Sequence, residues 1–151
     1  VPAIAGFGLA AEMSEHGRRE NSASMAQMRQ RLISQLTASL DDIVINSPET
    51  AGENAGECCS SLLNISFLGT RGEVLLHTLE QDGIYVSTGS ACSSNKKGQS
   101  HVLKAMGLKD KEIEGTLRFS FGRMNSIEEI DIAADKVAAA VKRFRRLGSF
   151  R

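Results

Sequence analysis

The feature that most constrains the fold is the interleaving of strand-like and helix-like hydrophobic patterns along one short chain. The strand-like runs are short and either rich in β-branched residues or alternating in polarity: 42–46, 61–67, 83–86 and 116–121. The helix-like runs carry apolar residues at helical spacing or helix start and stop signals: 2–10, 25–40, 73–81, 100–106, 110–115 and 126–144. This order predicts a layered α/β (α+β) domain, with a small sheet packed against helices.

Length and charge narrow the class of protein. A chain of 151 residues is the size of one ordinary domain. Its 18 basic residues balance its 18 acidic residues, so no net field favours nucleic acid or an anionic membrane. No apolar run approaches the roughly 20 residues that span a bilayer. The chain begins at Val1 without an initiating Met or a signal-peptide pattern, and we expect a processed chain or a piece of something longer.

The cysteine count excludes two kinds of site. The chain has three cysteines, and two of them, Cys58 and Cys59, are adjacent in a predicted loop before a strand. An odd number of cysteines, two of them adjacent, is not the pattern of a disulfide framework. We therefore expect the protein to reside in a reducing cytoplasm. Because there is no C-x-x-C pair and the histidines are scattered, the sequence predicts no metal site.

The third cysteine, Cys92, lies in a loop of small polar residues, STGSACSS at 87–94. A free thiol normally packs as a small hydrophobe, and this setting cannot bury it. Lys96, Lys97 and His101 follow closely and are candidates to favour the thiolate. Two interpretations stay open at this point: a reactive thiol, or an ordinary cysteine in an exposed loop.

Arg118 is the second candidate functional residue. It alternates with Leu117 and Phe119 in a predicted strand, so it points to the opposite face of the sheet from them. An arginine fixed on a strand suits bidentate capture of a carboxylate. The alternative is a salt bridge with a neighbouring Asp or Glu.

Around these two positions the sequence resembles the carboxyl-terminal part of the NifS/IscS-like (group I) cysteine desulfurases, which belong to aminotransferase class V. The S-x-G-S-A-C block at 87–92 is specific to that group and differs from the SufS-like block. The similarity extends over nearly the whole chain and is carried by six segments: 1–10, 63–67, 87–94, 100–108, 117–123 and 125–131.

The resemblance implies a fold and a reaction. It implies the small domain of a pyridoxal-phosphate enzyme of fold type I, which converts L-cysteine to L-alanine. By resemblance, Cys92 attacks the sulfur of the cofactor-bound substrate, becomes a persulfide and passes the sulfur to an acceptor such as an iron–sulfur scaffold protein. Arg118 then binds the substrate carboxylate, and Arg123 has a structural role. The family implies a homodimer.

The segment that holds the cofactor in this family has no counterpart here. Lys96, Lys97 and Lys104 lack the sequence context of the family's Schiff-base lysine. We therefore expect residues 1–151 to be the small domain alone, without the large lysine-bearing domain, and to bind no cofactor and be inactive in isolation. Two alternatives stay open: a stand-alone persulfide carrier or regulatory interaction module, and a related pyridoxal-phosphate enzyme acting on selenocysteine or a β-elimination substrate.

Overall fold

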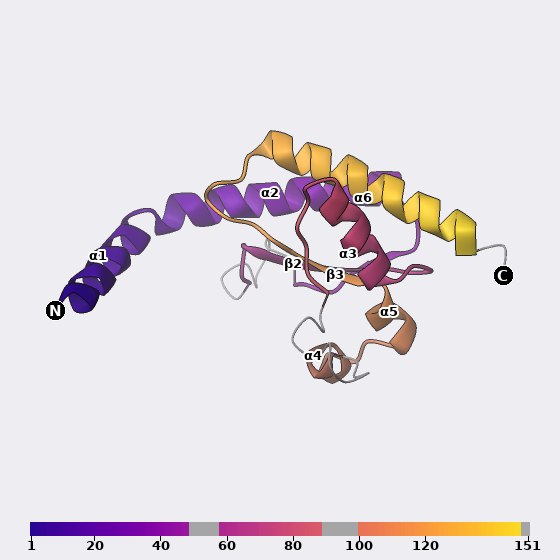
Figure 1. Ribbon diagram of the computed structural model, residues 1–151, viewed down its shortest axis with the longest axis horizontal. Coiled ribbons are helices and arrows are strands. Elements are labelled where there is room, and N and C mark those ends of the chain that lie inside the picture. The colour runs from indigo at the N-terminus through magenta and orange to yellow at the C-terminus, as the bar shows by residue number, and fades with distance from the viewer. Residues whose placement is uncertain (49–57, 89–99, 149–151) are drawn as a thin grey trace.

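The computed structural model describes residues 1–48, 58–88 and 100–148, and Cys92 lies outside them. Their helices are α1 (Pro2–His16), α2 (Arg18–Ser39), α3 (Gly72–Gln81), α4 (His101–Ala105), α5 (Asp110–Glu114) and α6 (Ile127–Gly148). Their strands are β1 (Ile43–Ile45), β2 (Leu62–Phe67) and β3 (Thr116–Ser120) (Figure 1). The predicted α/β class, a small sheet with helices packed on it, is confirmed.

The three strands form one antiparallel sheet in the order β1-β2-β3. Ile65 of β2 pairs with Ile45 on one side and with Leu117 on the other. Because side chains alternate across a strand, this register places Leu63, Ile65 and Leu117 on the same face, and all three are fully buried. The hydrophobic core therefore lies on this face of the sheet.

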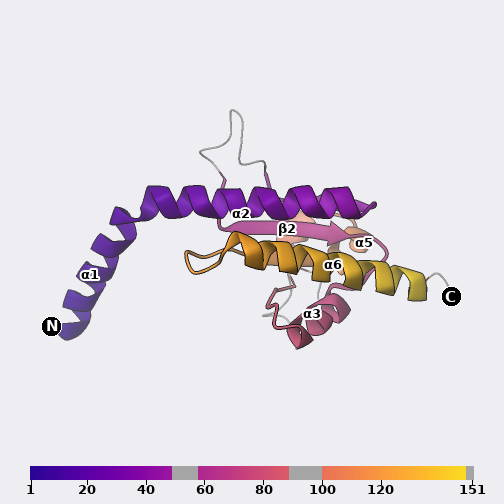
Figure 2. The same cartoon turned by 90° about the horizontal axis from the view of Figure 1, so that it is seen from above.

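Two long helices cover the buried face. Helices α2 and α6 run side by side over the sheet (Figure 2), and α2 contributes Met28, Leu32 and Leu36 to the core. The predicted capping box at the start of α6 is present. The Ser126 hydroxyl accepts a hydrogen bond from the Glu129 N–H (3.3 Å), and the Glu129 carboxylate accepts one from the Ser126 N–H (3.1 Å).

The prediction of a strand over 83–86 is wrong. After α3 the chain turns at Gly83, which has a φ of 77°, and the Ile84 N–H donates back to the Leu79 carbonyl at the end of that helix. Because the Ile84 N–H is used in that hydrogen bond, it cannot pair with a neighbouring strand. In this part of the chain the described strand pairing is a single bridge, between Ser87 and Arg118.

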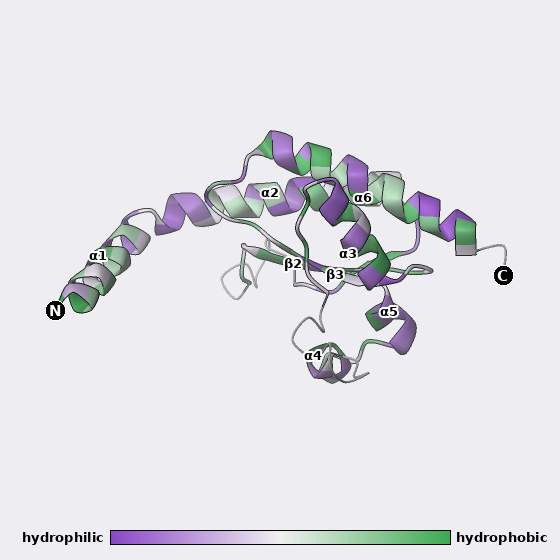
Figure 3. Cartoon of the chain, viewed as in Figure 1, coloured by the Kyte–Doolittle hydropathy of each residue, from purple (hydrophilic) through white to green (hydrophobic). Residues whose placement is uncertain are grey.

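Helix α1 extends away from the rest of the domain (Figure 1) and buries none of its residues. Green, apolar stretches alternate with polar ones along the ribbon of α1 in Figure 3. The apolar residues Ile4, Phe7 and Leu9 of this helix are all exposed. Among the described residues, no helix is both long enough and apolar enough to cross a membrane.

Candidate functional site

Arg118 lies on the face of the sheet opposite the core. Its neighbours Leu117 and Phe119 are buried and it is exposed, as the alternation predicts. The expected alternative was a salt bridge with an acidic residue. Within residues 1–48, 58–88 and 100–148, the Arg118 guanidinium forms no ion pair and no side-chain hydrogen bond. In the described part of the chain it is therefore available to an external anion.

The chain that leads to Cys92 is attached directly to Arg118. The Ser87 N–H donates to the Arg118 carbonyl (3.1 Å), and the Arg118 N–H donates to the Ser87 carbonyl (2.7 Å). Cys92 follows Ser87 by five residues, which limits the distance between their Cα atoms to about 18 Å. Ser87 thus fixes one end of the Cys92 segment next to the arginine.

Asn64 lies opposite Arg118 on the other neighbouring strand. The Asn64 N–H donates to the Ser47 hydroxyl (2.9 Å), and its carbonyl accepts from the Asn46 N–H (2.9 Å), so both backbone groups point toward β1. The backbone N–H and carbonyl of Arg118 point toward Ser87 instead. Asn64 and Arg118 are therefore a non-hydrogen-bonded pair, the arrangement that brings cross-strand side chains closest.

A chain of side-chain hydrogen bonds orients the Asn64 amide. The Asn46 amide group donates to the Asn64 Oδ1 and to the Ser66 Oγ, both at 2.7 Å. Because the Thr116 hydroxyl donates to the Glu112 carbonyl (2.7 Å), the Ser66 hydroxyl must donate to Thr116 (3.1 Å). This direction assigns the Asn64 Oδ1 as an acceptor and leaves its Nδ2 as a donor on the same face of the sheet as Arg118.

Sequence reasoning did not identify Asn64. The signal was the second face of the alternating run 62–67, where polar residues Asn64 and Ser66 occupy the positions between Leu63, Ile65 and Phe67. A polar face of this kind is equally typical of a solvent-exposed surface without a function. It becomes a site only through its register with Arg118.

Of the remaining candidates, those that the structure describes make no hydrogen bond or ion pair with the Arg118 side chain. His101 begins α4 and is exposed, and Lys96 and Lys97 lie outside the described residues. Cys58 and Cys59 are free thiols in the loop before β2, as predicted. Arg123 is exposed, and it makes no ion pair in the part of the chain that the structure describes.

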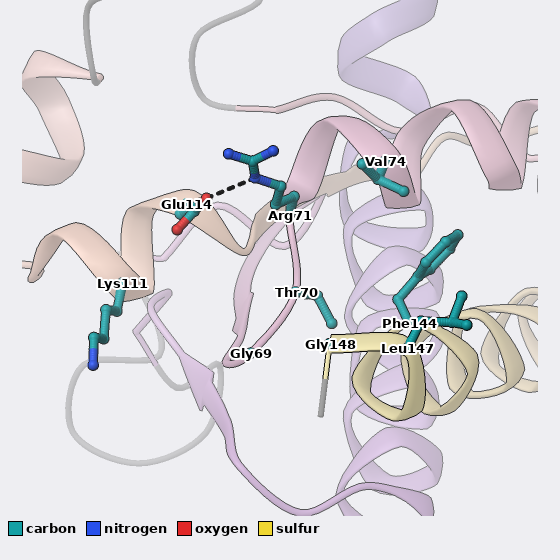
Figure 4. Close-up of a pocket in the computed structure, with 9 residues that line it drawn as sticks. All are labelled: Gly69, Thr70, Arg71, Val74, Lys111, Glu114, Phe144, Leu147 and Gly148. Carbon is teal, nitrogen blue, oxygen red and sulfur yellow. Dashed lines mark hydrogen bonds and ion pairs between the residues drawn. The ribbon is translucent and has the colours of Figure 1, made fainter. Parts of the chain in front are cut away.

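A pocket of about 620 Å³ lies elsewhere, among the start of α3, α5 and the end of α6 (Figure 4). Val74, Phe144 and Leu147 form its apolar part. Its charged part holds an ion pair between Arg71 and Glu114 (2.9 Å). Neither Arg118 nor Ser87 lines this pocket, so it is separate from the site above.

The described residues do not fit the cofactor that the resemblance implies. Pyridoxal phosphate needs an enclosed lysine for its Schiff base. The lysines that the structure describes are all exposed: Lys104, Lys109, Lys111, Lys136 and Lys142. The described residues likewise contain no cluster of three or more His, Cys, Asp or Glu side chains that would hold a metal ion.

Known proteins resemble the chain in both sequence and fold. It is 35% identical over 146 residues to an IscS-like cysteine desulfurase of Mycobacterium tuberculosis, covering 97% of this chain and 36% of that protein. It is 33% identical over 144 residues to cysteine desulfurase IscS of Clostridium botulinum, covering 95% and 35%. Among solved structures, a NifS-like protein matches with a TM-score of 0.77 and 28% identity, covering 94% of this chain and 34% of that one.

The chain thus spans about a third of the length of these relatives. The fold agrees with that of the NifS-like protein over nearly all of this chain. The Aminotransferase class-V family matches residues 1–132. This chain therefore belongs to the aminotransferase class-V family.

Proposed function

We propose that residues 1–151 form the carboxyl-terminal small domain of a cysteine desulfurase, which converts L-cysteine to L-alanine and keeps the sulfur as a persulfide on Cys92. The observation that carries the proposal is the backbone pairing of Ser87 with Arg118, which attaches the Cys92 segment to an arginine whose side chain has no partner among the described residues. The relatives named as cysteine desulfurases, to which nearly all of this chain aligns, support it.

Arg118 and Asn64 bind the substrate carboxylate in this proposal. The arginine supplies a planar, permanently charged fork that matches the two carboxylate oxygens. The Asn64 Nδ2 lies on the same face and adds a neutral donor. Together they fix the amino-acid end of the substrate and leave its thiol end free to meet Cys92.

Cys92 is the sulfur acceptor. Its thiolate forms an S–S bond with the substrate sulfur while the Cβ–S bond of the substrate breaks. The electron pair of that bond stays with carbon, which takes up a proton and becomes the methyl group of alanine. Atoms balance: cysteine and a thiol give alanine and a persulfide. We propose that the persulfide then passes its sulfur to an acceptor protein, such as an iron–sulfur scaffold, in the cytoplasm.

Family membership implies pyridoxal phosphate, the electron sink for such chemistry. We place its site in a large domain outside these residues, because the described lysines are all exposed. The exposed apolar residues of α1 support this arrangement, since that helix has surface for the large domain to cover. We also propose that the whole enzyme is a homodimer, as the resemblance implies.

The carboxylate assignment is tested with Arg118→Lys in the holoenzyme. Lysine keeps the charge and loses the bidentate fork, so we expect the KM for L-cysteine to rise about tenfold or more. The visible absorbance of the bound cofactor should not change. Ser120→Ala, two residues along the same exposed face, is the matched control. An unaltered KM in Arg118→Lys would contradict the assignment.

A further inference from the structure

The adjacent cysteines Cys58 and Cys59 have different surroundings. The Cys58 thiol is half-buried and donates to the Pro48 carbonyl (3.4 Å), a hydrogen bond that only the protonated thiol can make. The Cys59 thiol is exposed, and its sulfur lies 3.1 Å from the Ser61 hydroxyl. A hydroxyl can donate to a thiolate, so the Cys59 hydrogen bond survives ionisation.

Further donors surround the Cys59 sulfur. The Ser61 hydroxyl, followed by the backbone N–H of Ser61, lowers the pKa of the Cys59 thiol below its ordinary value. The Leu62 N–H and the positive charge of Arg29 act in the same direction. These groups come from three neighbouring parts of the chain: the loop before β2, the first residue of β2 and helix α2. Thiolate character together with exposure is what makes a cysteine reactive.

The Arg29 side chain is an independent sign of a site for negative charge. It is 1% exposed, and its Nη2 donates to the Pro48 carbonyl (2.5 Å), the same oxygen that accepts from Cys58. Its Nε and Nη1 are buried and have no hydrogen-bond partner in the described part of the chain. A buried cation stabilises an anion formed nearby, and the positive charge of Arg29 favours the Cys59 thiolate in this way.

We propose that Cys59 is a second reactive thiol, separate from Cys92, which hydroperoxides oxidise to a sulfenic acid. The thiolate attacks the peroxide, an S–O bond forms and the O–O bond breaks. Sulfur loses two electrons, and the peroxide is reduced to an alkoxide or hydroxide that takes a proton from water. The Cys59 loop is joined to the chain just after β3, where the Ser61 carbonyl accepts from the Phe121 N–H, whereas the segment that leads to Cys92 is joined to Arg118 within β3.

The first test compares the two neighbouring thiols within one protein. The purified wild-type protein is treated briefly with hydrogen peroxide and a sulfenic-acid trap, and modified peptides are located by tandem mass spectrometry. In parallel, iodoacetamide alkylation is timed at each cysteine at neutral pH. We expect the trap adduct on Cys59, and alkylation there about fivefold or more faster than at Cys58. Equal rates at the two thiols, or an adduct on Cys58 alone, would overturn the proposal.

A matched pair of serine variants tests the cause. Ser61→Ala removes the hydroxyl that faces the Cys59 sulfur, so alkylation of Cys59 should slow about threefold or more while Cys58 is unaffected. Ser60→Ala removes the adjacent hydroxyl, which pairs with Ser22 instead, and should leave both rates unchanged. Equal effects of the two variants would show that the loop, rather than this hydrogen bond, sets the rate and would refute the assignment. The comparison of wild-type thiols does not depend on either variant folding.

Discussion

Arg118 and Ser87 exchange two backbone hydrogen bonds, at 2.7 Å and 3.1 Å. This single bridge places an exposed guanidinium beside the segment that carries Cys92. Since the Arg118 backbone is fully used in that bridge, Arg118 and Asn64 on the other neighbouring strand form a non-hydrogen-bonded pair, with both side chains on the same face of the sheet. Substrate binding and sulfur transfer therefore depend, in our proposal, on adjacent positions of one sheet edge.

Replacing Asn64 should weaken substrate binding specifically. In the holoenzyme, Asn64→Ala removes the neutral donor next to Arg118, and we expect the KM for L-cysteine to rise about fivefold to tenfold. The cofactor absorbance and kcat should change little, whereas a general loss of structure would lower both. Leu62→Ala, on the same face of β2, is the control. A lower kcat with an unchanged KM would refute a role in carboxylate binding.

The link between α2 and α6 should depend on pH. Hydrogen bonds from Arg31 hold the pKa of Asp131 below its usual range, and Gln35 adds another. A depressed carboxylate pKa stabilises the fold above the unfolded value of about 4, and this contribution is lost as the pH falls through the folded value.

We therefore expect Asp131→Asn to lower the urea midpoint near pH 7, with the difference shrinking to zero in strong acid. Asp135→Asn, on the same helix and without an ion pair in the described part of the chain, should show no such trend. High salt should also reduce the Asp131 effect, because both partners are partly exposed. A difference between wild type and Asp131→Asn that stays constant from neutral to acid pH would contradict the pairing.

Gly115 should not tolerate a side chain. A Cβ at this position would overlap the Phe67 carbonyl oxygen, and Phe67 also donates its N–H to the Gly115 carbonyl (2.9 Å). We expect Gly115→Ala to lower the free energy of unfolding by about 1–3 kcal/mol, measured by urea denaturation. Gly6→Ala in α1, where a Cβ meets no atom within 4 Å, should be neutral or slightly stabilising. Similar urea midpoints for the two variants would contradict the close approach.

The parts of the fold that follow from the sequence are those whose pattern needs no distant partner. The capping box of Ser126 and Glu129, and the alternation of Leu117, Arg118 and Phe119, are local and predicted α6 and β3 correctly. The prediction of a strand over 83–86 was wrong because a strand forms only where a second segment pairs with it, and the local pattern does not show whether one does. Ile84 donates to the end of α3, and within the described part of this segment only Ser87 pairs with β3.

The same limit applies to the candidate site. Arg118 was identified from its place in a strand, but its neighbour Asn64 is set by strand register, which the sequence does not state. The burial of Arg29 is also not predictable from α2, because a charged residue in a helix is most often solvated. Both features become visible only when segments far apart in sequence are brought together.

The most direct test of the proposed sulfur transfer is the mass of the peptide that contains Cys92. The holoenzyme is incubated with L-cysteine without an acceptor, digested under non-reducing conditions and compared with a Cys92→Ala variant that still shows cofactor absorbance. Our account predicts one added sulfur atom on Cys92 in the wild type, and no alanine production by the variant. Added sulfur on Cys58 or Cys59 instead of Cys92, or continued alanine formation in Cys92→Ala, would contradict it.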